Sequence, residues 1–189
     1  MHFTVEAQNV AKHYLNAGAI AIDATLGNGS DTLFLAEQVG SSGVVYGIDI
    51  QSCAIETARR KLQDAGTLQQ CKLFVGCHSQ LRSIVDPIHV GAVSVAMFNL
   101  GYLPLGDKSI VTDPKTTFAA LEQVVDMMKL GGLISILAYP GHTGGMQETK
   151  CVTEWVELRR TEFHVERFQD STNVTSPILI FMTKEFDKH

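Results

Sequence analysis

The sequence predicts an α/β fold in which a seven-stranded, mostly parallel sheet carries helices on both faces and ends in an antiparallel hairpin. Three observations lead to this prediction. Short apolar runs alternate with amphipathic stretches along the chain, which is typical of β–α–β units in a parallel sheet. Within the runs, polar and apolar residues alternate little, as expected for strands buried on both faces. The last two runs have no helical pattern between them, so we expect them to pair as a hairpin.

Each predicted element follows from this alternation. The parallel strands are expected at residues 19–24, 43–50, 72–76, 90–100 and 133–139. The helical patterns between them cover residues 31–39, 53–64, 116–129 and 145–161. The Lys-Leu-Gly-Gly sequence at 129–132 is typical of a helix C-terminus. The hairpin is expected from residues 163–168 and 177–184, with the final strand antiparallel.

Length and composition favour a single domain over residues 1–189, because a chain with 45% hydrophobic residues can bury a full core. No apolar run approaches the roughly 20 residues that span a bilayer, and no signal peptide is evident, so we expect a cytoplasmic protein without membrane contact. The four cysteines lack metal-ligand spacing, and no metal site is predicted. The net charge of −5 argues against indiscriminate nucleic-acid binding but leaves an RNA substrate open. We interpret the basic clusters as solvated helix faces; they comprise residues 59–61, and residues 159–160 with Arg167. We interpret Trp155 as a core side chain.

The first predicted strand leads into a glycine-rich loop, Asp-Ala-Thr-Leu-Gly-Asn-Gly-Ser-Asp-Thr at 23–32. Ligands of open α/β sheets bind at the carboxyl ends of the strands, and Gly27 and Gly29 allow backbone N–H groups to approach a ligand closely. Thr32 stands where a third glycine would complete a dinucleotide fingerprint. The carboxylates of Asp23 and Asp31 would repel a pyrophosphate but attract an ammonium or sulfonium group. The loop therefore predicts S-adenosylmethionine as the cofactor.

Further cofactor contacts are expected at the next two strand ends. Asp49 ends the second strand, where a carboxylate can accept hydrogen bonds from both hydroxyls of a ribose. His78 and Ser79 follow the third strand, beside the expected place of the adenine, although an ordinary surface turn explains them too. Ser30 or Asp31 is expected to cap the helix after the glycine loop. The predicted cofactor-binding residues are Asp23, Thr25, Gly27, Asn28, Gly29, Asp31, Asp49, Gln51, His78, Ser79 and Asn99.

The fourth strand ends in Phe-Asn-Leu-Gly-Tyr-Leu-Pro at 98–104, next to the expected place of the reactive methyl group. Asn99 and Tyr102 resemble the Asn/Asp-Pro-Pro-Tyr/Phe motif of amine-methylating enzymes, in which the Asn oxygen accepts a hydrogen bond from the target nitrogen. Methyl transfer depends mainly on positioning the nitrogen lone pair. An aliphatic amine must also lose a proton, which costs about 4 to 5 kcal/mol at pH 7 if its pKa is about 10.4.

Three proton acceptors stay open, namely His142, Asp107 and solvent. His142 lies in Tyr-Pro-Gly-His at 139–142, a loop after the fifth strand that is expected to face the substrate, although a surface turn would also explain it. Asp107 and Lys108 form either a polar turn or part of the substrate rim. The predicted catalytic residues are Asn99, Tyr102 and His142.

Several motifs occur in the same order as in a known family. They cover residues 23–32, 47–51, 98–104, 106–108, 139–142 and the Gly-Gly-x-x-Glu that ends at Glu148. Over nearly its whole length the chain resembles the small class I methyltransferases of the rRNA methylase family, which implies a Rossmann-like class I methyltransferase fold. Members of this family are understood to methylate the aminomethyl group at position 5 of the tRNA wobble uridine, giving 5-methylaminomethyl-2-thiouridine. Leu105 departs from the family's Pro-Gly-Gly-Asp-Lys pattern, which bears on the shape of the substrate loop. By this resemblance the cofactor is lined by Asp23, Gly27, Gly29, Asp49 and His78, and the amine is faced by Asn99 and Tyr102.

The sequence thus predicts an S-adenosylmethionine-dependent N-methyltransferase that acts on tRNA, at the wobble uridine of the anticodon stem-loop. An rRNA, small-molecule or protein amine is the alternative substrate. A nicotinamide-dependent oxidoreductase is disfavoured by the loop carboxylates, and a module that binds the cofactor without catalysis is disfavoured by Asn99 and Tyr102. Because the chain is short and has little basic surface, a homodimer is a further hypothesis for presenting a wider face to RNA.

Overall fold

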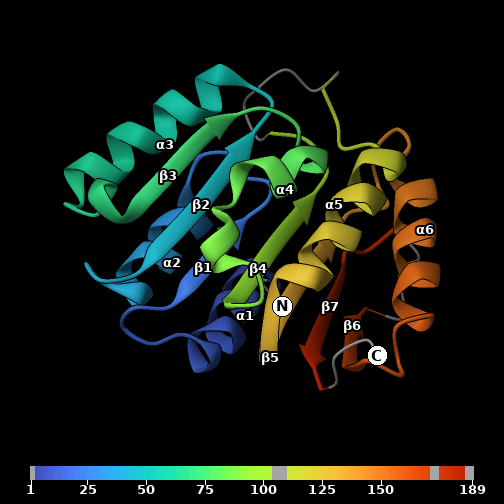
Figure 1. The fold of residues 1–189 in the computed structure, drawn as a ribbon. Helices are drawn as coiled ribbons and strands as arrows, with labels where there is room; N and C mark the ends of the chain where they lie inside the picture. Colours follow the sequence, from blue (N-terminus) through green and yellow to red (C-terminus); the bar gives the residue numbers. More distant parts are fainter. Residues whose placement is uncertain (1–2, 104–109, 171–174, 186–189) are drawn as a thin grey trace.

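The computed structural model describes residues 3–103, 110–170 and 175–185, which form a single sheet with helices packed on it (Figure 1). The seven strands have the order β3-β2-β1-β4-β5-β7-β6. β1 to β5 run parallel, and β7 is antiparallel to both β5 and β6. The predicted fold class and its C-terminal hairpin are confirmed. The strands are β1 Ile20–Asp23, β2 Val44–Asp49, β3 Cys71–Val75, β4 Val93–Leu100, β5 Met128–Ala138, β6 Phe163–Gln169 and β7 Ile178–Lys184.

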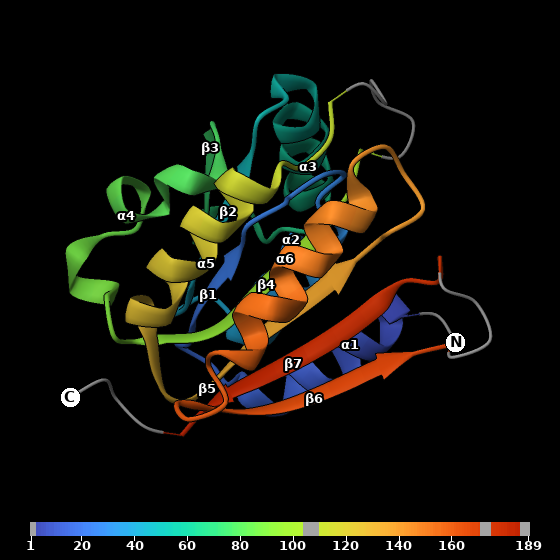
Figure 2. The same ribbon diagram turned by 90° about the vertical axis from the view of Figure 1, so that its right-hand side faces the viewer.

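Helices cover both faces of the sheet. They are α1 Phe3–Ala11, α2 Ser30–Val39, α3 Ser52–Asp64, α4 Leu81–Ile84, α5 Pro114–Met127 and α6 Gly145–Glu157. Figure 2 shows α1 behind β6 and β7, on the opposite side of the sheet from α5 and α6. None of the helices in the described part of the chain has the length and apolar character needed to cross a membrane.

The core consists of two layers, one on each face of the sheet. In β4, Ala96 and Phe98 belong to the layer under α4, α5 and α6, whereas Val95 and Met97 belong to the layer under α1 and α2. Because successive strand residues point to opposite faces and both faces are buried, β4 reads as one continuous apolar run. Trp155 of α6 is buried, as expected for a core side chain.

Three predicted helix ends are wrong. The helix expected at 116–129 ends at Met127, and residues 129–132 belong to β5. Val93 pairs with Met128 and Val95 with Leu133, so four residues of β5 stand opposite the single residue Ser94 of β4. Gly131, at φ +71°, lets the chain turn there. The helix expected at 145–161 ends at Glu157. Neither residue expected to cap α2 does so, because Gly29 stands at the cap position without a side-chain hydrogen bond.

Gly29 is required by the packing of α2 against α3. Its backbone is left-handed, with φ +73°, and a Cβ atom there would lie 2.6 Å from the Cβ and 2.9 Å from the Cα of Ala58 in α3. Gly66 has a similar backbone, with φ +71°, but nothing lies within 4 Å of its Cβ position. Both glycines therefore adopt a left-handed backbone that disfavours other residues. Only at Gly29 would a side chain also clash with a neighbouring helix.

We expect Gly29→Ala to destabilise the protein more than Gly66→Ala. Both variants place a Cβ in a left-handed conformation, which costs about 1 to 2 kcal/mol. Gly29→Ala adds overlap with the α3 backbone, at a further cost of about 1 to 3 kcal/mol. Urea unfolding monitored by circular dichroism measures both free energies. Equal losses in the two variants would contradict the packing role of Gly29.

Candidate active site

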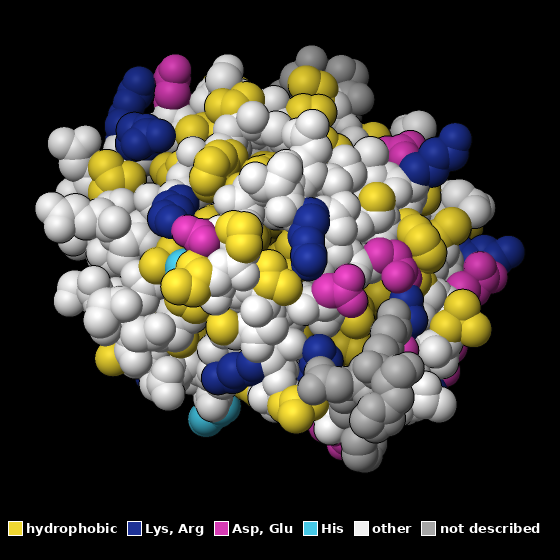
Figure 3. Space-filling view, viewed as in Figure 1, with side chains coloured by type: hydrophobic (Ala, Val, Ile, Leu, Met, Phe, Trp, Pro, Cys, Tyr) yellow, Lys and Arg dark blue, Asp and Glu magenta, His cyan; other side chains and the backbone are white. Residues whose placement is uncertain are grey.

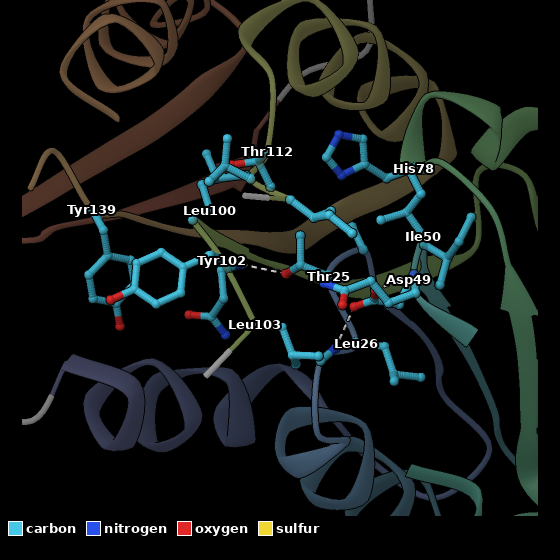
Figure 4. Close-up of a pocket in the computed structure, with 18 of the residues that line it drawn as sticks. Thr25, Leu26, Asp49, Ile50, His78, Leu100, Tyr102, Leu103, Thr112 and Tyr139 are labelled. Atoms are coloured by element: carbon cyan, nitrogen blue, oxygen red, sulfur yellow. Dashed lines mark hydrogen bonds between the residues drawn. The ribbon is translucent and has the colours of Figure 1, made fainter. Parts of the chain in front are cut away.

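A pocket of about 690 Å³ opens at the carboxyl ends of the parallel strands. It lies where β1 is flanked by β2 on one side and β4 on the other, which is the switch point at which ligands of open α/β sheets bind. Figure 4 shows His78, Ile50 and Asp49 at one end of the pocket, and Tyr102 and Tyr139 at the other. One end therefore holds an imidazole, an aliphatic side chain and a carboxylate, and the other holds two phenol rings.

Asp49 joins the loops that follow β1 and β2. The backbone N–H of Gly27 donates to its Oδ2 and that of Gln51 to its Oδ1, each at 2.9 Å (Figure 4). A carboxylate oxygen can accept more than one hydrogen bond, and Asp49 is half-buried in the pocket wall. Its carboxylate can therefore hold the glycine loop and still accept hydrogen bonds from hydroxyls of a ligand.

Asn99, at the end of β4, is fixed through both its backbone and its side chain. Its backbone N–H donates to the hydroxyl of Thr25 at 2.7 Å. Its side-chain Nδ2 donates to Oδ2 of Asp31, and the other oxygen of Asp31 accepts from Nε2 of Gln8 at 2.7 Å. With the amide nitrogen turned to Asp31, the amide oxygen of Asn99 faces the opposite way.

Asp23 and Asp31 are buried, at 1% and 5% exposure. Asp23 accepts hydrogen bonds from the hydroxyl of Thr32 at 2.6 Å and from the N–H of Thr25 at 3.3 Å. Burial, followed by the nearby carboxylate of Asp31, raises the pKa of Asp23 to about 7. Burial also raises the pKa of Asp31. Asp23 therefore contributes less negative charge to the loop near neutral pH than its sequence indicates.

His78 supplies a neutral ring to the other end of the pocket. It is buried, and burial lowers its pKa. Its Nε2 lies 3.3 Å from the hydroxyl of Thr116 and its ring packs beside Phe98. A neutral imidazole can both donate and accept hydrogen bonds, which suits the edge of a nucleobase better than a phosphate.

Tyr102 and His142 meet at the opposite end. Their rings pack edge to face, with centroids 6.1 Å apart, and Tyr102 is 42% exposed. His142 Nδ1 lies 2.9 Å from the carbonyl oxygen of Thr143, so Nδ1 carries the proton of the neutral ring. Nε2 is shielded from solvent and has no hydrogen-bond partner among the described residues. Its lone pair is therefore available as an acceptor.

The structure brings most predicted site residues into one pocket. Those that line it are Thr25, Gly27, Asn28, Asp31, Asp49, Gln51, His78, Asn99, Tyr102 and His142. Asp23, Gly29 and Ser79 are not among the lining residues; the Ser79 hydroxyl donates to the Cys77 sulfur at 3.1 Å. Leu105, Asp107 and Lys108 lie outside the described residues.

Sequence reasoning missed the contribution of α1. Thr4 lines the pocket and Gln8 binds Asp31, whereas Ala7 and Ala11 are buried in the core. The signal was present, because residues at i and i+4 share a helix face, so the two polar residues fall on one side and the two alanines on another. Tyr139 also lines the pocket, although only its neighbour His142 was selected from that loop.

Basic side chains on α6 and after it are paired within the chain. Arg159 binds Glu122 and Glu162 and lies over the ring of Trp155, and Arg160 binds Glu157. On the face shown in Figure 3, the Lys and Arg side chains of the described residues are scattered among acidic and apolar ones. Arg159 and Arg160 lie beyond the end of α6, and the Arg159 side chain is only 16% exposed, so their interpretation as part of a solvated helix face is wrong.

Comparison with known proteins gives one consistent set of relatives. Residues 45–184 match the family model described as "Putative rRNA methylase". The chain is 39% identical over 190 residues to a tRNA (mnm(5)s(2)U34)-methyltransferase, chloroplastic, of Arabidopsis thaliana, covering 96% of this chain and 69% of that protein. A "putative rRNA-methylase" structure from Clostridium thermocellum is 34% identical, with a TM-score of 0.91 and coverage of 97% and 98% of the two chains. A "putative methyltransferase" from Streptococcus mutans, crystallised with SAH, is 29% identical, with a TM-score of 0.85 and the same coverage.

The raised pKa of Asp23 predicts a pH-dependent stability that Asp23→Asn removes. The folded pKa of about 7 exceeds the ordinary aspartate value of 3.8, so the carboxyl group favours folding below about pH 4 and loses this contribution as the pH rises through 7. Between these values the unfolding free energy of the wild type should fall relative to that of Asp23→Asn, by up to about 1.4 kcal/mol per pH unit. Urea unfolding at several pH values measures the difference. A difference that does not vary with pH would overturn the assignment.

Proposed function

Because this chain belongs to the rRNA methylase family of class I, S-adenosylmethionine-dependent methyltransferases, we propose that it methylates the aminomethyl nitrogen at position 5 of the tRNA wobble uridine. The observation that carries the proposal is the placement of Asn99 and Tyr102 in one pocket with Asp49 and the glycine loop. An amide oxygen beside an exposed aromatic ring suits an amine acceptor. The Arabidopsis relative is named as a methyltransferase of mnm(5)s(2)U34 in tRNA, which agrees with such an acceptor.

The residues of the pocket fit S-adenosylmethionine, which supplies an activated methyl group on a sulfonium. Asp49 retains acceptor capacity for ribose hydroxyls, and His78 offers a neutral ring for the adenine edge. Ile50, 60% exposed beside Asp49, offers an apolar surface for the base. Asp31 places a carboxylate for an ammonium group. We assign direct binding to Thr25, Gly27, Asn28, Asp31, Asp49, Gln51, His78 and Asn99, and an indirect role behind the pocket wall to Asp23, Gly29 and Ser79.

Two residues at the end of β4 position the target amine. The amide oxygen of Asn99 accepts a hydrogen bond from the amine and so orients the nitrogen lone pair, and the ring of Tyr102 restricts the amine from the side. Alignment of this kind accounts for most of the catalysis that a displacement at carbon requires of the protein.

His142 is our candidate for the proton acceptor. The carbonyl of Thr143 holds the proton on Nδ1, so the basic lone pair is on Nε2, next to Tyr102. Because Nε2 is shielded from solvent in the structure, this role requires substrate binding to uncover it. The ammonium form of the substrate then passes one proton to Nε2 and becomes a free amine, and the imidazolium releases that proton to solvent.

We propose the anticodon stem-loop as the docking partner and a homodimer as the form that binds it. The net charge of −5 opposes binding to a phosphate backbone, and Arg159 and Arg160 are already paired within the chain. Two subunits would double the surface available to one RNA. Light scattering at working concentration should give the mass of a dimer; a monomer mass would contradict this part of the proposal.

A cytoplasmic location stays a prediction. The relative from Arabidopsis is named as chloroplastic, which is a different compartment from the one predicted here. The substrate proposal does not depend on it, because tRNA with a modified wobble uridine is the requirement in either compartment.

The direct test is incubation with cofactor and tRNA that carries 5-aminomethyl-2-thiouridine, followed by nucleoside mass spectrometry. We expect 5-methylaminomethyl-2-thiouridine to form. Ribosomal RNA in a parallel reaction tests the substrate in the family description. The proposal would be contradicted if only rRNA were methylated. It would also be contradicted if the protein bound the cofactor but methylated neither RNA.

Two substitutions should separate cofactor binding from methyl transfer. Asp49→Ala removes a charged acceptor and is expected to weaken cofactor binding about 10- to 100-fold in calorimetry. Asn99→Ala removes the acceptor for the amine and is expected to lower kcat about 100-fold, with cofactor affinity reduced far less than in Asp49→Ala. Unchanged affinity in the first variant, or near-normal turnover in the second, would remove that residue from its role.

A further inference from the structure

α1 contributes two polar side chains to the site, one in the pocket wall and one behind it. Thr4 and Gln8 are one helical turn apart, so they share a face. Thr4 lines the pocket, and its side chain forms a hydrogen bond with Tyr139, whose pKa is raised by burial. Gln8 does not line the pocket but binds Asp31, which does. The helix therefore touches the site both directly and through a second residue.

Gln8, Asp31 and Asn99 form a continuous chain of hydrogen bonds. Gln8 donates to Oδ1 of Asp31 at 2.7 Å, and Asn99 donates to Oδ2 of the same carboxylate. An ionised carboxylate only accepts, whereas each amide has one end that donates and one that accepts. Asp31 therefore selects one of the two orientations of the Asn99 amide, with nitrogen inward and oxygen outward. In the reversed orientation Asn99 would present N–H donors, which cannot accept a hydrogen bond from an amine.

We propose that Gln8 is a positioning residue for methyl transfer, which acts through Asp31 to hold the amide oxygen of Asn99 toward the target amine. The inference rests on the proposed function, because the role of Asn99 is assigned there. This role adds α1 to the elements that position the target amine. Among the hydrogen bonds described above, α1 is linked to Asn99 only through Asp31.

Several groups from other elements act on the Asp31 carboxylate. Burial raises its pKa, whereas the hydrogen bonds from Gln8 and Asn99 and the charge of Lys61 in α3 lower it. Asp23 on β1 and Tyr139 after β5 are also coupled to it electrostatically. Removal of Gln8 takes away one stabiliser of the ionised form. A protonated Asp31 would carry an O–H donor and would no longer fix the Asn99 amide.

The first test is Gln8→Ala, with Asn9→Ala as its matched control, because Asn9 is exposed on the same helix. We expect kcat at saturating cofactor to fall about 3- to 10-fold in Gln8→Ala, with cofactor affinity unchanged. The acid limb of the kcat profile should move to higher pH, which simple loosening of α1 would not produce. Equal kcat values and pH profiles in the two variants would overturn the inference.

The second test exchanges the amide and the carboxylate. In the wild type the carboxylate of Asp31 lies between the amides of Gln8 and Asn99. Asp31→Asn alone replaces that carboxylate with a third amide, and Gln8→Glu alone places a second carboxylate beside it. In the double variant the carboxylate at position 8 can accept from the new amide at 31, whose oxygen can again accept from Asn99. We expect the double variant to exceed both single variants in turnover at saturating cofactor. A double variant no faster than Asp31→Asn would show that Asp31 acts on a ligand alone, and would overturn the inference.

A readout without substrate separates this inference from the proposed function. In NMR hydrogen exchange, the Nδ2 protons of Asn99 should be protected in the wild type and in Asn9→Ala and lose protection in Gln8→Ala. Retained protection would overturn the positioning role even if the enzyme is active. Absence of tRNA methylation by the wild type, with the protection change present, would overturn the proposed substrate alone.

Discussion

The active site depends on one carboxylate, Asp49, which accepts the backbone N–H groups of Gly27 and Gln51. These two bonds fix the loops after β1 and β2 to each other at the switch point of the sheet. Once the first loop is held, the hydroxyl of Thr25 can receive the N–H of Asn99, so the end of β4 is placed by the same set of contacts. The positions of the cofactor-binding and amine-facing groups are thus linked through backbone hydrogen bonds, which tolerate little displacement.

The buried carboxylates are satisfied largely by neutral donors. Asp23 accepts from Thr32 and Thr25, and Asp31 accepts from Gln8 and Asn99. A close Arg or Lys partner would satisfy them as well, but it would cancel the negative potential of the loop. Neutral donors keep that potential, although burial leaves Asp23 only partly ionised near neutral pH. The site remains suited to a sulfonium and to an amine that arrives as an ammonium.

Much of the fold and site could be predicted, because strands buried on both faces leave continuous apolar runs and parallel strands bring their carboxyl ends together. Other features depend on tertiary contacts. The glycines at 131 and 132 follow a cation, as at a helix end, yet they turn the chain within β5. The partial neutrality of Asp23 follows from burial, which the loop sequence does not reveal. Gln8 gains a role only because α1 packs against β5 and reaches Asp31.

The contact between Gly29 and Ala58 has a consequence for the evolution of this family. A glycine in a nucleotide-binding loop is usually interpreted as room for the ligand, but here a Cβ would meet the α3 backbone instead. Selection at position 29 therefore acts on the spacing of two helices, and position 58 is confined to small residues by the same contact. A descendant that lost Gly29 would have to move α3 first, so the two positions should diverge together across lineages and independently of any change in cofactor.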